Sequence, residues 1–258
     1  MSRPTAQIAV ITPTTLDPVR LGYLTELHDS LERQTVPFEW ILAPNGPDAE
    51  LRRLPPQIAA DPRVIICARP RPGAAYARNT ALNYVTAPYT CYVDDDDLLP
   101  EGSLATRHEH AVRTGLDWVA GWSADLHADG TTRTWVCPTP VGRHTPGQVW
   151  TYWNSPETKP PLGHTMLLTR TELLRLSAGH GGLVKGEDYV LVLGVTGRGA
   201  GELLPEVVYL YRDHAHQMTE QTDYRDASEY DARRFAFLHG QELHRAAQRQ
   251  LLAGSATP

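Results

Sequence analysis

The sequence predicts an α/β protein in which helices flank a doubly wound, mostly parallel sheet. Short apolar segments alternate with segments of helical spacing through residues 7–93. Polar and acidic residues follow several of the apolar segments, as expected where the carboxyl ends of parallel strands form a ligand-binding edge. The phosphate-binding patterns GxGxxG and GxxxxGK[ST] do not occur, so neither nucleotide fingerprint contributes to this prediction.

The first half of the chain is expected to contain four strands. Leucines recur at helical spacing between residues 19 and 33, and Pro37 ends that segment. A turn at residues 44–47 separates the second strand from a helix that Asp48 is expected to cap. The expected strands are residues 7–11, 38–43, 63–67 and 89–93, and the expected helices are residues 19–33, 48–59 and 74–85, with another starting near Glu101.

The second half is less regular. Residues 144–161 are rich in Pro, Gly and aromatic residues and are expected to form a binding loop. Residues 226–252 carry apolar side chains at helical spacing and are expected to form a C-terminal helix. The other expected elements are strands at residues 117–126, 132–137, 165–169 and 207–211, a short helix around residues 173–174 and a helix at residues 187–195.

Four consecutive carboxylates, Asp94–Asp97, follow the apolar strand at residues 89–93. Right-handed crossovers place them at the same sheet edge as the loop after Thr12 and the turn at Asn45. Four like charges repel one another, and a divalent cation that prefers oxygen ligands, Mg²⁺ or Mn²⁺, would relieve that cost. The alternative is a solvated acidic turn that caps the helix near Glu101. The cluster alone does not distinguish between the two.

The composition is that of a globular protein. The chain has 258 residues, of which 41% are hydrophobic, and this suffices for a sizeable core. The formal net charge of −6 and the lack of a long basic run argue against nucleic acid as a partner. No metal-binding spacing links Cys67, Cys91 and Cys137, and no apolar run is long enough to span a membrane. We therefore expect a cytoplasmic protein without disulfides, and peripheral membrane association stays open.

Five short motifs occur in order between residues 7 and 219. They are Ile11-Thr12-Pro13-Thr14 with Ser30-Leu31-Glu32-Arg33-Gln34-Thr35, the segment from Gly73 to Leu82 (GxxxARNxxL), the segment from Tyr92 to Pro100 (YVDDDDLLP), Gly186-Glu187-Asp188, and Tyr211-Arg212-Asp213-His214. Each motif is a weak signal, but together and at this spacing they resemble those of the inverting glycosyltransferases of family 2. The resemblance implies the GT-A fold, with a C-terminal helical extension.

The resemblance also implies a reaction and a set of site residues. A sugar would pass from a nucleoside-diphosphate donor to an acceptor hydroxyl, with Asp188 as the base and Glu187 supporting it. A divalent metal, Mn²⁺ or Mg²⁺, would contact Asp96 and His214; His216 does not align with the motif. The residues implied in donor binding are Pro13, Thr14, Thr15, Asn45, Arg78, Asp94, Asp95 and Asp96.

On the same basis, residues 1–225 would form the GT-A domain and residues 226–258 a C-terminal helix and tail. The nucleotide-binding half would extend to about residue 115, and the acceptor half would cover about residues 116–225. Trp150, Trp153 and His164 would contact the acceptor, although the two tryptophans can equally be core residues. We expect a small-molecule, glycan or lipid-linked acceptor, as in natural-product or surface-glycan assembly, rather than processive synthesis. The oligomeric state stays open, with a dimer as one option.

Several of these assignments have a structural alternative. The alternative for Arg78 is a salt bridge to the acidic cluster, and for Asp97 it is a helix cap. Glu187 and Asp188 precede a helix whose N-terminus favours carboxylates, so capping is their alternative. For His214 the alternative is an ordinary hydrogen-bonding histidine.

The sequence departs from the family pattern after the second strand. The family commonly has Asp-Asp-Gly-Ser there, and an Asp in that segment reads uracil, whereas residues 43–48 are Ala-Pro-Asn-Gly-Pro-Asp. An amide such as Asn45 can still hydrogen-bond a base edge, so UDP, GDP and dTDP all stay open. The alternative functions are a sugar-phosphate nucleotidyltransferase, whose Gly-rich basic loop is missing here, and a relative that binds nucleotide or glycan without turnover.

Overall fold

The computed structural model describes residues 5–46, 50–67, 73–183, 185–214 and 227–254. A nine-stranded sheet has the strand order β3-β2-β1-β4-β8-β5-β9-β7, with β6 paired to β5. The strands are β1 (Ile8–Thr14), β2 (Phe38–Pro44), β3 (Val64–Ile66), β4 (Tyr89–Tyr92), β5 (Trp118–Leu126), β6 (Thr132–Trp135), β7 (Gly142–His144), β8 (Leu167–Arg170) and β9 (Gly201–Arg212). The α-helices are α1 (Pro18–Glu32), α2 (Pro56–Ala59), α3 (Ala74–Ala81), α4 (Ser103–Thr114), α5 (Thr171–Leu176), α6 (Glu187–Arg198) and α7 (Ala227–Gly254). Four short 3₁₀ helices are η1 (Leu51–Arg53), η2 (Leu82–Tyr84), η3 (Gln148–Tyr152) and η4 (His164–Met166).

The first half of the sheet is parallel, as the sequence predicts. β1 pairs with β2 on one side and with β4 on the other, and β2 pairs with β3. Ile8 and Val10 of β1 pack into one core, whereas Ala9 and Ile11 pack into the core on the opposite face. Because both faces are covered, these strands are continuous apolar runs in the sequence rather than alternating ones.

The second half of the sheet joins the first through β8. This strand pairs antiparallel with both β4 and β5, and β5 then runs parallel to β9. The backbone of Gly201 at the start of β9 lies against Trp118, where an added Cβ would come within 1.9 Å of the ring. Further along, Leu98 and Leu210 form an isolated antiparallel bridge, which ties the acidic segment after β4 to the far part of β9.

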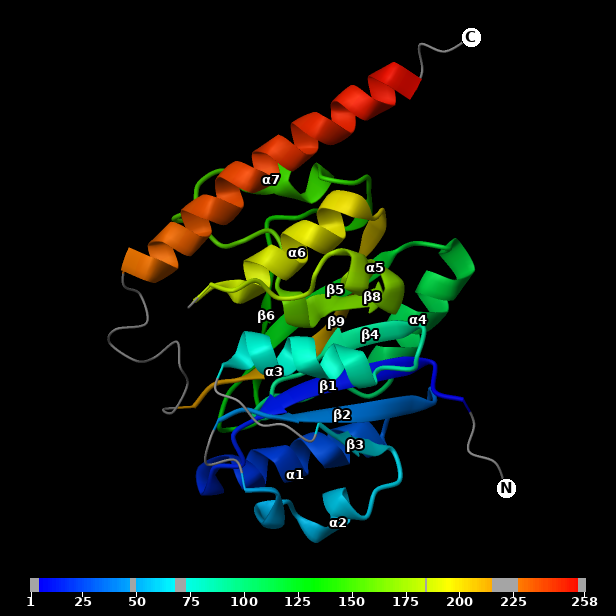
Figure 1. The fold of residues 1–258 in the computed structure, drawn as a ribbon, viewed down its shortest axis with the longest axis vertical. Coiled ribbons are helices and arrows are strands. Elements are labelled where there is room, and N and C mark those ends of the chain that lie inside the picture. Colours follow the sequence, from blue (N-terminus) through cyan, green and yellow to red (C-terminus); the bar gives the residue numbers. More distant parts are fainter. Residues whose placement is uncertain (1–4, 47–49, 68–72, 184, 215–226, 255–258) are drawn as a thin grey trace.

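Helices cover both faces of the sheet. Side chains of α1, α2 and α4 contribute to the core that contains Ile8, and those of α3, α5, α6 and α7 contribute to the core that contains Ile11. Figure 1 shows α1 and α2 at one end of the molecule and α6 and α7 at the other. These layers confirm the predicted α/β class with its doubly wound sheet and its C-terminal helix.

The C-terminal helix α7 packs on the core through one face. Its Ala232 and Ala236 are buried in the same cluster as Tyr189 of α6. Its C-terminal end extends beyond the rest of the molecule (Figure 1). None of the helices in the described ranges has the length and apolar character that a membrane crossing requires.

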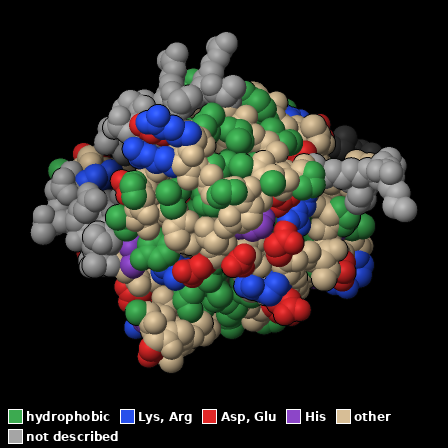
Figure 2. Space-filling view, turned by 90° about the horizontal axis from the view of Figure 1, so that it is seen from below, with side chains coloured by type: hydrophobic (Ala, Val, Ile, Leu, Met, Phe, Trp, Pro, Cys, Tyr) green, Lys and Arg blue, Asp and Glu red, His purple; other side chains and the backbone are tan. Residues whose placement is uncertain are grey.

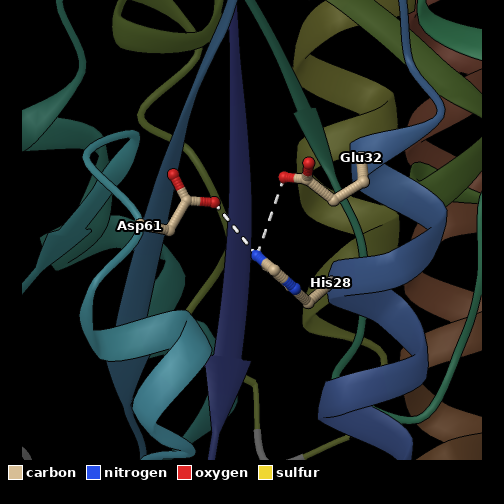
Figure 3. A group of neighbouring side chains, drawn as sticks. All are labelled: His28, Glu32 and Asp61. Carbon is tan, nitrogen blue, oxygen red and sulfur yellow. Dashed lines mark hydrogen bonds and ion pairs between the residues drawn. The ribbon is translucent and has the colours of Figure 1, made fainter.

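A histidine-centred cluster ties α1 to the loop before β3 (Figure 3). Nε2 of His28 lies 3.1 Å from Oδ2 of Asp61 and 3.8 Å from Oε1 of Glu32. Arg63 pairs with both carboxylates, and its Nη2 lies 2.7 Å from Asp61. The His28 ring also stacks on Trp40, with the ring centroids 5.8 Å apart. Because Arg63 already neutralises the carboxylates, we assign this cluster a structural role: it fixes α1 against the amino end of β3.

Most of the predicted elements are present with shifted ends. The helix expected at residues 48–59 is replaced by η1 and α2, and its expected cap, Asp48, lies outside the described residues. The helix expected near Glu101 begins at Ser103, after Gly102 in a left-handed conformation. Two parts of the sheet were not predicted from the sequence: β7, which has three residues, and the first part of β9.

Charges of both signs are interspersed on the face that Figure 2 shows. Asp and Glu side chains lie next to Lys and Arg side chains there, around apolar groups.

Candidate active site

The carboxyl ends of β1, β2 and β4 meet at one edge of the sheet, as predicted. The backbone N–H of Asn45 donates to the carbonyl of Thr14 at 2.7 Å, and that of Val93 donates to the carbonyl of Ile11 at 3.0 Å. The Asp94–Asp97 segment follows immediately, so its carboxylates start where the parallel strands end.

Asp95 is a buried member of this segment. It is 3% exposed, and its Oδ1 accepts a hydrogen bond from Arg20 at 2.6 Å. The buried hydroxyl of Thr14 accepts a hydrogen bond from the backbone N–H of Leu16 at 3.2 Å. Burial raises the pKa of Asp95 to about 6, although the charge of Arg20 lowers it. The side chains of Thr14 and Asp95 therefore hold the loop together and offer little surface to a donor.

The other residues expected near the donor in this loop differ in exposure. Pro13 lies within β1, where it pairs with Ala43 and is buried. Thr15 is exposed, and its hydroxyl accepts from the backbone N–H of Asp17 at 3.4 Å. Of the three residues from Pro13 to Thr15, only Thr15 presents its side chain to solvent. The expected donor contacts of all three stay predictions.

Asp96 and His214 are brought together from β4 and the end of β9. Nε2 of His214 and Nη1 of Arg20 each lie 2.9 Å from Oδ2 of Asp96. Asp96 and His214 therefore offer a carboxylate and an imidazole side by side, a pair of ligand types that would suit a divalent ion such as Mn²⁺. The pair thus fits the predicted metal, and His216 lies outside the described residues.

Asp97 holds β9 in place. Its Oδ2 accepts from the hydroxyl of Tyr209 at 2.6 Å, and its Oδ1 accepts from the backbone N–H of Arg212 at 2.8 Å. Burial, together with the neighbouring carboxylates of Asp96 and Asp94, raises the pKa of Asp97 well above its usual range. The alternative that Asp97 caps a helix is wrong, because the residue before α4 is Gly102.

Arg78 of α3 joins two acidic parts of the site. Its Nη2 lies 2.6 Å from Oδ1 of Asp94, and its Nη1 lies 2.9 Å from Oε1 of Glu187. The Arg78 side chain is 6% exposed, whereas Asp94 is 28% exposed and Glu187 19%. Burial would lower the pKa of Arg78, but the two carboxylates outweigh it and raise the pKa. Arg78 thereby forms the salt bridge to the acidic cluster that was its structural alternative, and its expected donor contact stays a prediction. It also places Asp94 and Glu187 on either side of one guanidinium group.

The acidic pair Glu187 and Asp188 opens α6. Gly186, the residue before the helix, has φ +71°, and an added Cβ would come within 2.7 Å of Tyr189. Asp188 is 31% exposed, and its Oδ2 lies 3.6 Å from Nδ1 of His164. Burial would raise the pKa of Asp188, but the neighbouring His164 and the charge of Arg78 outweigh it and keep the pKa below its usual range. The carboxylate is therefore ionised at neutral pH.

Asn45 follows β2 and is half-buried. Its Oδ1 accepts a hydrogen bond from the backbone N–H of Gly73, which precedes α3, at 2.8 Å. With this oxygen occupied, the amide can present its Nδ2 donors toward a ligand at the sheet edge.

The structure corrects the acceptor assignment of two tryptophans. Trp150 and Trp153 are each 1% exposed. The indole N–H of Trp150 donates to Thr196 of α6 at 2.9 Å, and the Trp153 ring packs edge-on against Phe237 of α7. A ring enclosed in this way has no face for a sugar, so both residues belong to the core beneath α7. His164, in contrast, lies beside Asp188.

Sequence reasoning missed Arg20 and Tyr209 at this site. Arg20 contacts both Asp95 and Asp96, and Tyr209 donates to Asp97. Arg20 belongs to the first turn of a helix directly after the β1 loop, and this position was the available signal. Tyr209 gave no signal, because its position beside Asp97 depends on the pairing of β9 within the sheet.

Three comparisons place the chain among known proteins. The sequence profile described as Glycosyl transferase family 2 matches residues 9–161. S. aureus TarS 1–349 in complex with UDP-GlcNAc superposes with a TM-score of 0.65 at 18% identity, covering 90% of this chain and 66% of that one. TarS 1–349 alone gives a TM-score of 0.63 at 16% identity, covering 95% and 73%, and a further TarS structure gives 0.58 at 18% identity. The chain spans 37% of that further structure. No curated protein sequence matches.

Proposed function

Because the chain belongs to glycosyl transferase family 2 and has the GT-A fold, we propose that it moves a sugar from a nucleoside diphosphate to an acceptor hydroxyl with inversion. The chain is a glycosyltransferase, and family membership sets aside the nucleotidyltransferase alternative. We further propose that the reaction inverts the anomeric carbon, that it depends on a divalent metal, and that the acceptor is a small molecule, a glycan or a lipid-linked molecule.

The observation that carries the proposal is the bridge made by Arg78. Asp94, at the nucleotide edge of the sheet, and Glu187, beside Asp188, contact the two ends of one guanidinium group. A donor placed against Asp94 would therefore lie within reach of Asp188, on the side from which an acceptor can approach. Holding two reactants in this way supplies much of the rate enhancement in group-transfer reactions.

Asp188 would act as the general base of the displacement. It would take the proton from the acceptor hydroxyl, and the electron pair left on that oxygen would form the bond to the anomeric carbon. The bond from the anomeric carbon to the diphosphate would break at the same time, and its electrons would leave with the nucleoside diphosphate. A single displacement inverts the anomeric carbon and needs no covalent intermediate.

Asp96 and His214 would hold the divalent metal. A bound cation supplies charge stabilisation for the departing diphosphate. Arg20, which contacts the same oxygen of Asp96, would fix the orientation of this carboxylate from the other side. The carboxylate oxygens of Asp94 and Asp96 are hard ligands of the kind that such an ion prefers.

The donor nucleotide can be identified by a thermal-shift screen. We expect at least one of UDP, GDP, dTDP and CDP to raise the melting midpoint, because a ligand that binds only the folded state stabilises it. The shift should be larger with Mn²⁺ than with EDTA, since Asp96 and His214 would hold the metal whose charge favours diphosphate binding. UDP is the first to test, because TarS 1–349 has been crystallised with UDP and with UDP-GlcNAc. A chain that responds to none of the four contradicts the proposed function.

Asn45→Asp should shift donor preference toward UDP. Asp keeps the oxygen that accepts from Gly73 and replaces the amide N–H donors with a second acceptor oxygen. The uracil N3–H can donate to that oxygen, whereas cytosine presents an acceptor at N3. A hydrogen bond to a charged group contributes about 1.5–3 kcal/mol, so the ratio of UDP to CDP affinity should rise roughly 10- to 100-fold. Titration of both nucleotides into parent and variant measures the ratio, and an unchanged ratio removes Asn45 from the base site.

A further inference from the structure

A group of buried polar side chains lies next to Asp188. Tyr92, His164 and His180 are 2%, 9% and 3% exposed. Their rings form a triangle, with centroids 6.0 Å apart for Tyr92 and His164, 4.7 Å for Tyr92 and His180, and 5.3 Å for His164 and His180. Within the described part of the chain, the Tyr92 hydroxyl, Nε2 of His164 and both ring nitrogens of His180 have no hydrogen-bond partner. Buried polar atoms without partners are costly, so a cluster of them calls for an explanation.

The backbone around this triangle is held firmly. Asn79 of α3 donates to the carbonyl of His180 and accepts from its backbone N–H, both at 2.8 Å. The preceding Gly179 has φ +67°, and an added Cβ there would come within 2.3 Å of Asn79. His180 is therefore fixed beside His164 through α3, the helix that also carries Arg78.

His164 reaches Asp188 through one defined ring atom. Nδ1 of His164 lies 3.6 Å from Oδ2 of Asp188, whereas Nε2 is buried without a hydrogen-bond partner among the described residues. The distance exceeds that of a formed hydrogen bond, but such contacts at catalytic sites often shorten when substrate binds. A proton on Nδ1 would anchor Oδ2 and leave Oδ1 of the carboxylate for the acceptor.

We propose that His164 is a positioning residue: its Nδ1–H holds Oδ2 of Asp188 so that the other carboxylate oxygen faces the acceptor hydroxyl. This inference rests on the proposed function, since it assigns Asp188 the role of base. His180 packs edge-on against the His164 ring and Tyr92 packs against it at a tilt, and these two contacts keep the ring in this orientation. Burial lowers the pKa of His180 well below its usual value, so this neighbour stays neutral.

Three substitutions of His164 test whether its Nδ1–H positions Asp188 or whether the ring only fills space. Asn carries an amide where His carries Nδ1, and Gln carries one where His carries Nε2, so His164→Asn keeps the proposed donor and His164→Gln displaces it. His164→Phe keeps the shape of the ring without either nitrogen. The matched control is His108→Asn, the same change at a half-buried histidine that packs on Tyr89 in another part of the fold. Melting midpoints and nucleotide binding are measured for all four variants, together with steady-state release of nucleoside diphosphate.

We expect His164→Asn to keep kcat within a few-fold of the parent, and His164→Gln and His164→Phe to lose it on the order of 10²-fold, as misplacement of a reacting group does. The KM for the donor and the affinity for nucleotide should stay within a few-fold of the parent in all variants, and His108→Asn should behave as the parent. If His164→Asn is as inactive as His164→Phe while folded, the Nδ1 donor is not the feature that matters, and the inference is overturned. Full activity of His164→Gln overturns it as well. If the parent is active, Asp188→Asn is inactive and all His164 variants turn over normally, only the positioning role of His164 is wrong. If the parent releases no nucleoside diphosphate from any donor, the proposed function itself is wrong.

Discussion

Asp188→Asn is expected to lower turnover by about 10²–10⁴-fold, the usual contribution of a general base. The amide has the size of the carboxylate but cannot accept a proton at neutral pH. Nucleotide affinity should stay near that of the parent, because Asp188 contacts His164 and not the Asp94–Asp97 segment. Release of nucleoside diphosphate and a nucleotide titration on the same preparation measure the two effects.

Glu187→Gln is the comparison for this variant. Glu187 contacts Arg78, so its loss leaves a buried guanidinium with Asp94 as the partner that remains among the described contacts. We expect reduced activity with a lower melting midpoint, in contrast to Asp188→Asn, which should melt near the parent. If Asp188→Asn turns over within a few-fold of the parent while Glu187→Gln is folded and inactive, Glu187 is the base. If both retain activity, the inverting mechanism has no base and fails.

Asp96→Ala is expected to remove most of the activity and the Mn²⁺-dependent tightening of nucleotide binding. The substitution removes the carboxylate that would join the metal to the chain, and the departing diphosphate loses its charge stabilisation. Nucleotide titrations with Mn²⁺ and with EDTA give the metal-dependent part of the affinity for parent and variant. Equal binding and turnover of the parent under both conditions would show that the metal assignment is wrong.

His214→Ala tests the second proposed ligand of this metal. His214 lies 2.9 Å from Asp96, so its loss should weaken the metal dependence without abolishing it. His216→Ala is the control two residues further on, and it should have the smaller effect because His216 does not align with the motif. A larger effect at His216 would reverse the assignment.

The sequence predicts the parallel half of the sheet because burial on both faces leaves a local signal. The run from Ile8 to Ile11 is apolar throughout, since alternate residues serve opposite cores. The acidic segment could be placed at the sheet edge for the same reason, because it follows directly after such a strand. When a single short segment contains both a strand and the candidate ligand atoms, the local sequence pattern is sufficient to predict where those atoms lie.

The tryptophans of the second half could not be placed from the sequence. Trp150 lies in a segment rich in Pro and Gly, which suggests an exposed binding loop, but α7 returns from nearly a hundred residues later and covers it. Gly240 of α7 lets the two approach, since a Cβ there would come within 2.6 Å of the indole. The partners Arg20 and Tyr209 share this difficulty, because their contacts with Asp95 and Asp97 are made across elements distant in the chain. The contacts of these residues depend on tertiary packing, and the periodicity of a sequence gives no information about which distant segments pack together.

The configuration of the first-formed sugar tests the central claim most directly. The parent enzyme is mixed with the nucleotide sugar whose nucleotide gives the largest Mn²⁺-dependent thermal shift, and the anomeric proton of the released or transferred sugar is followed by NMR before mutarotation. A single displacement with Asp188 as base predicts that the product forms with the anomeric configuration opposite to that of the donor, and that Asp188→Asn forms it at least 10²-fold more slowly. A product that forms with the configuration of the donor, or at the same rate in Asp188→Asn, would contradict the account.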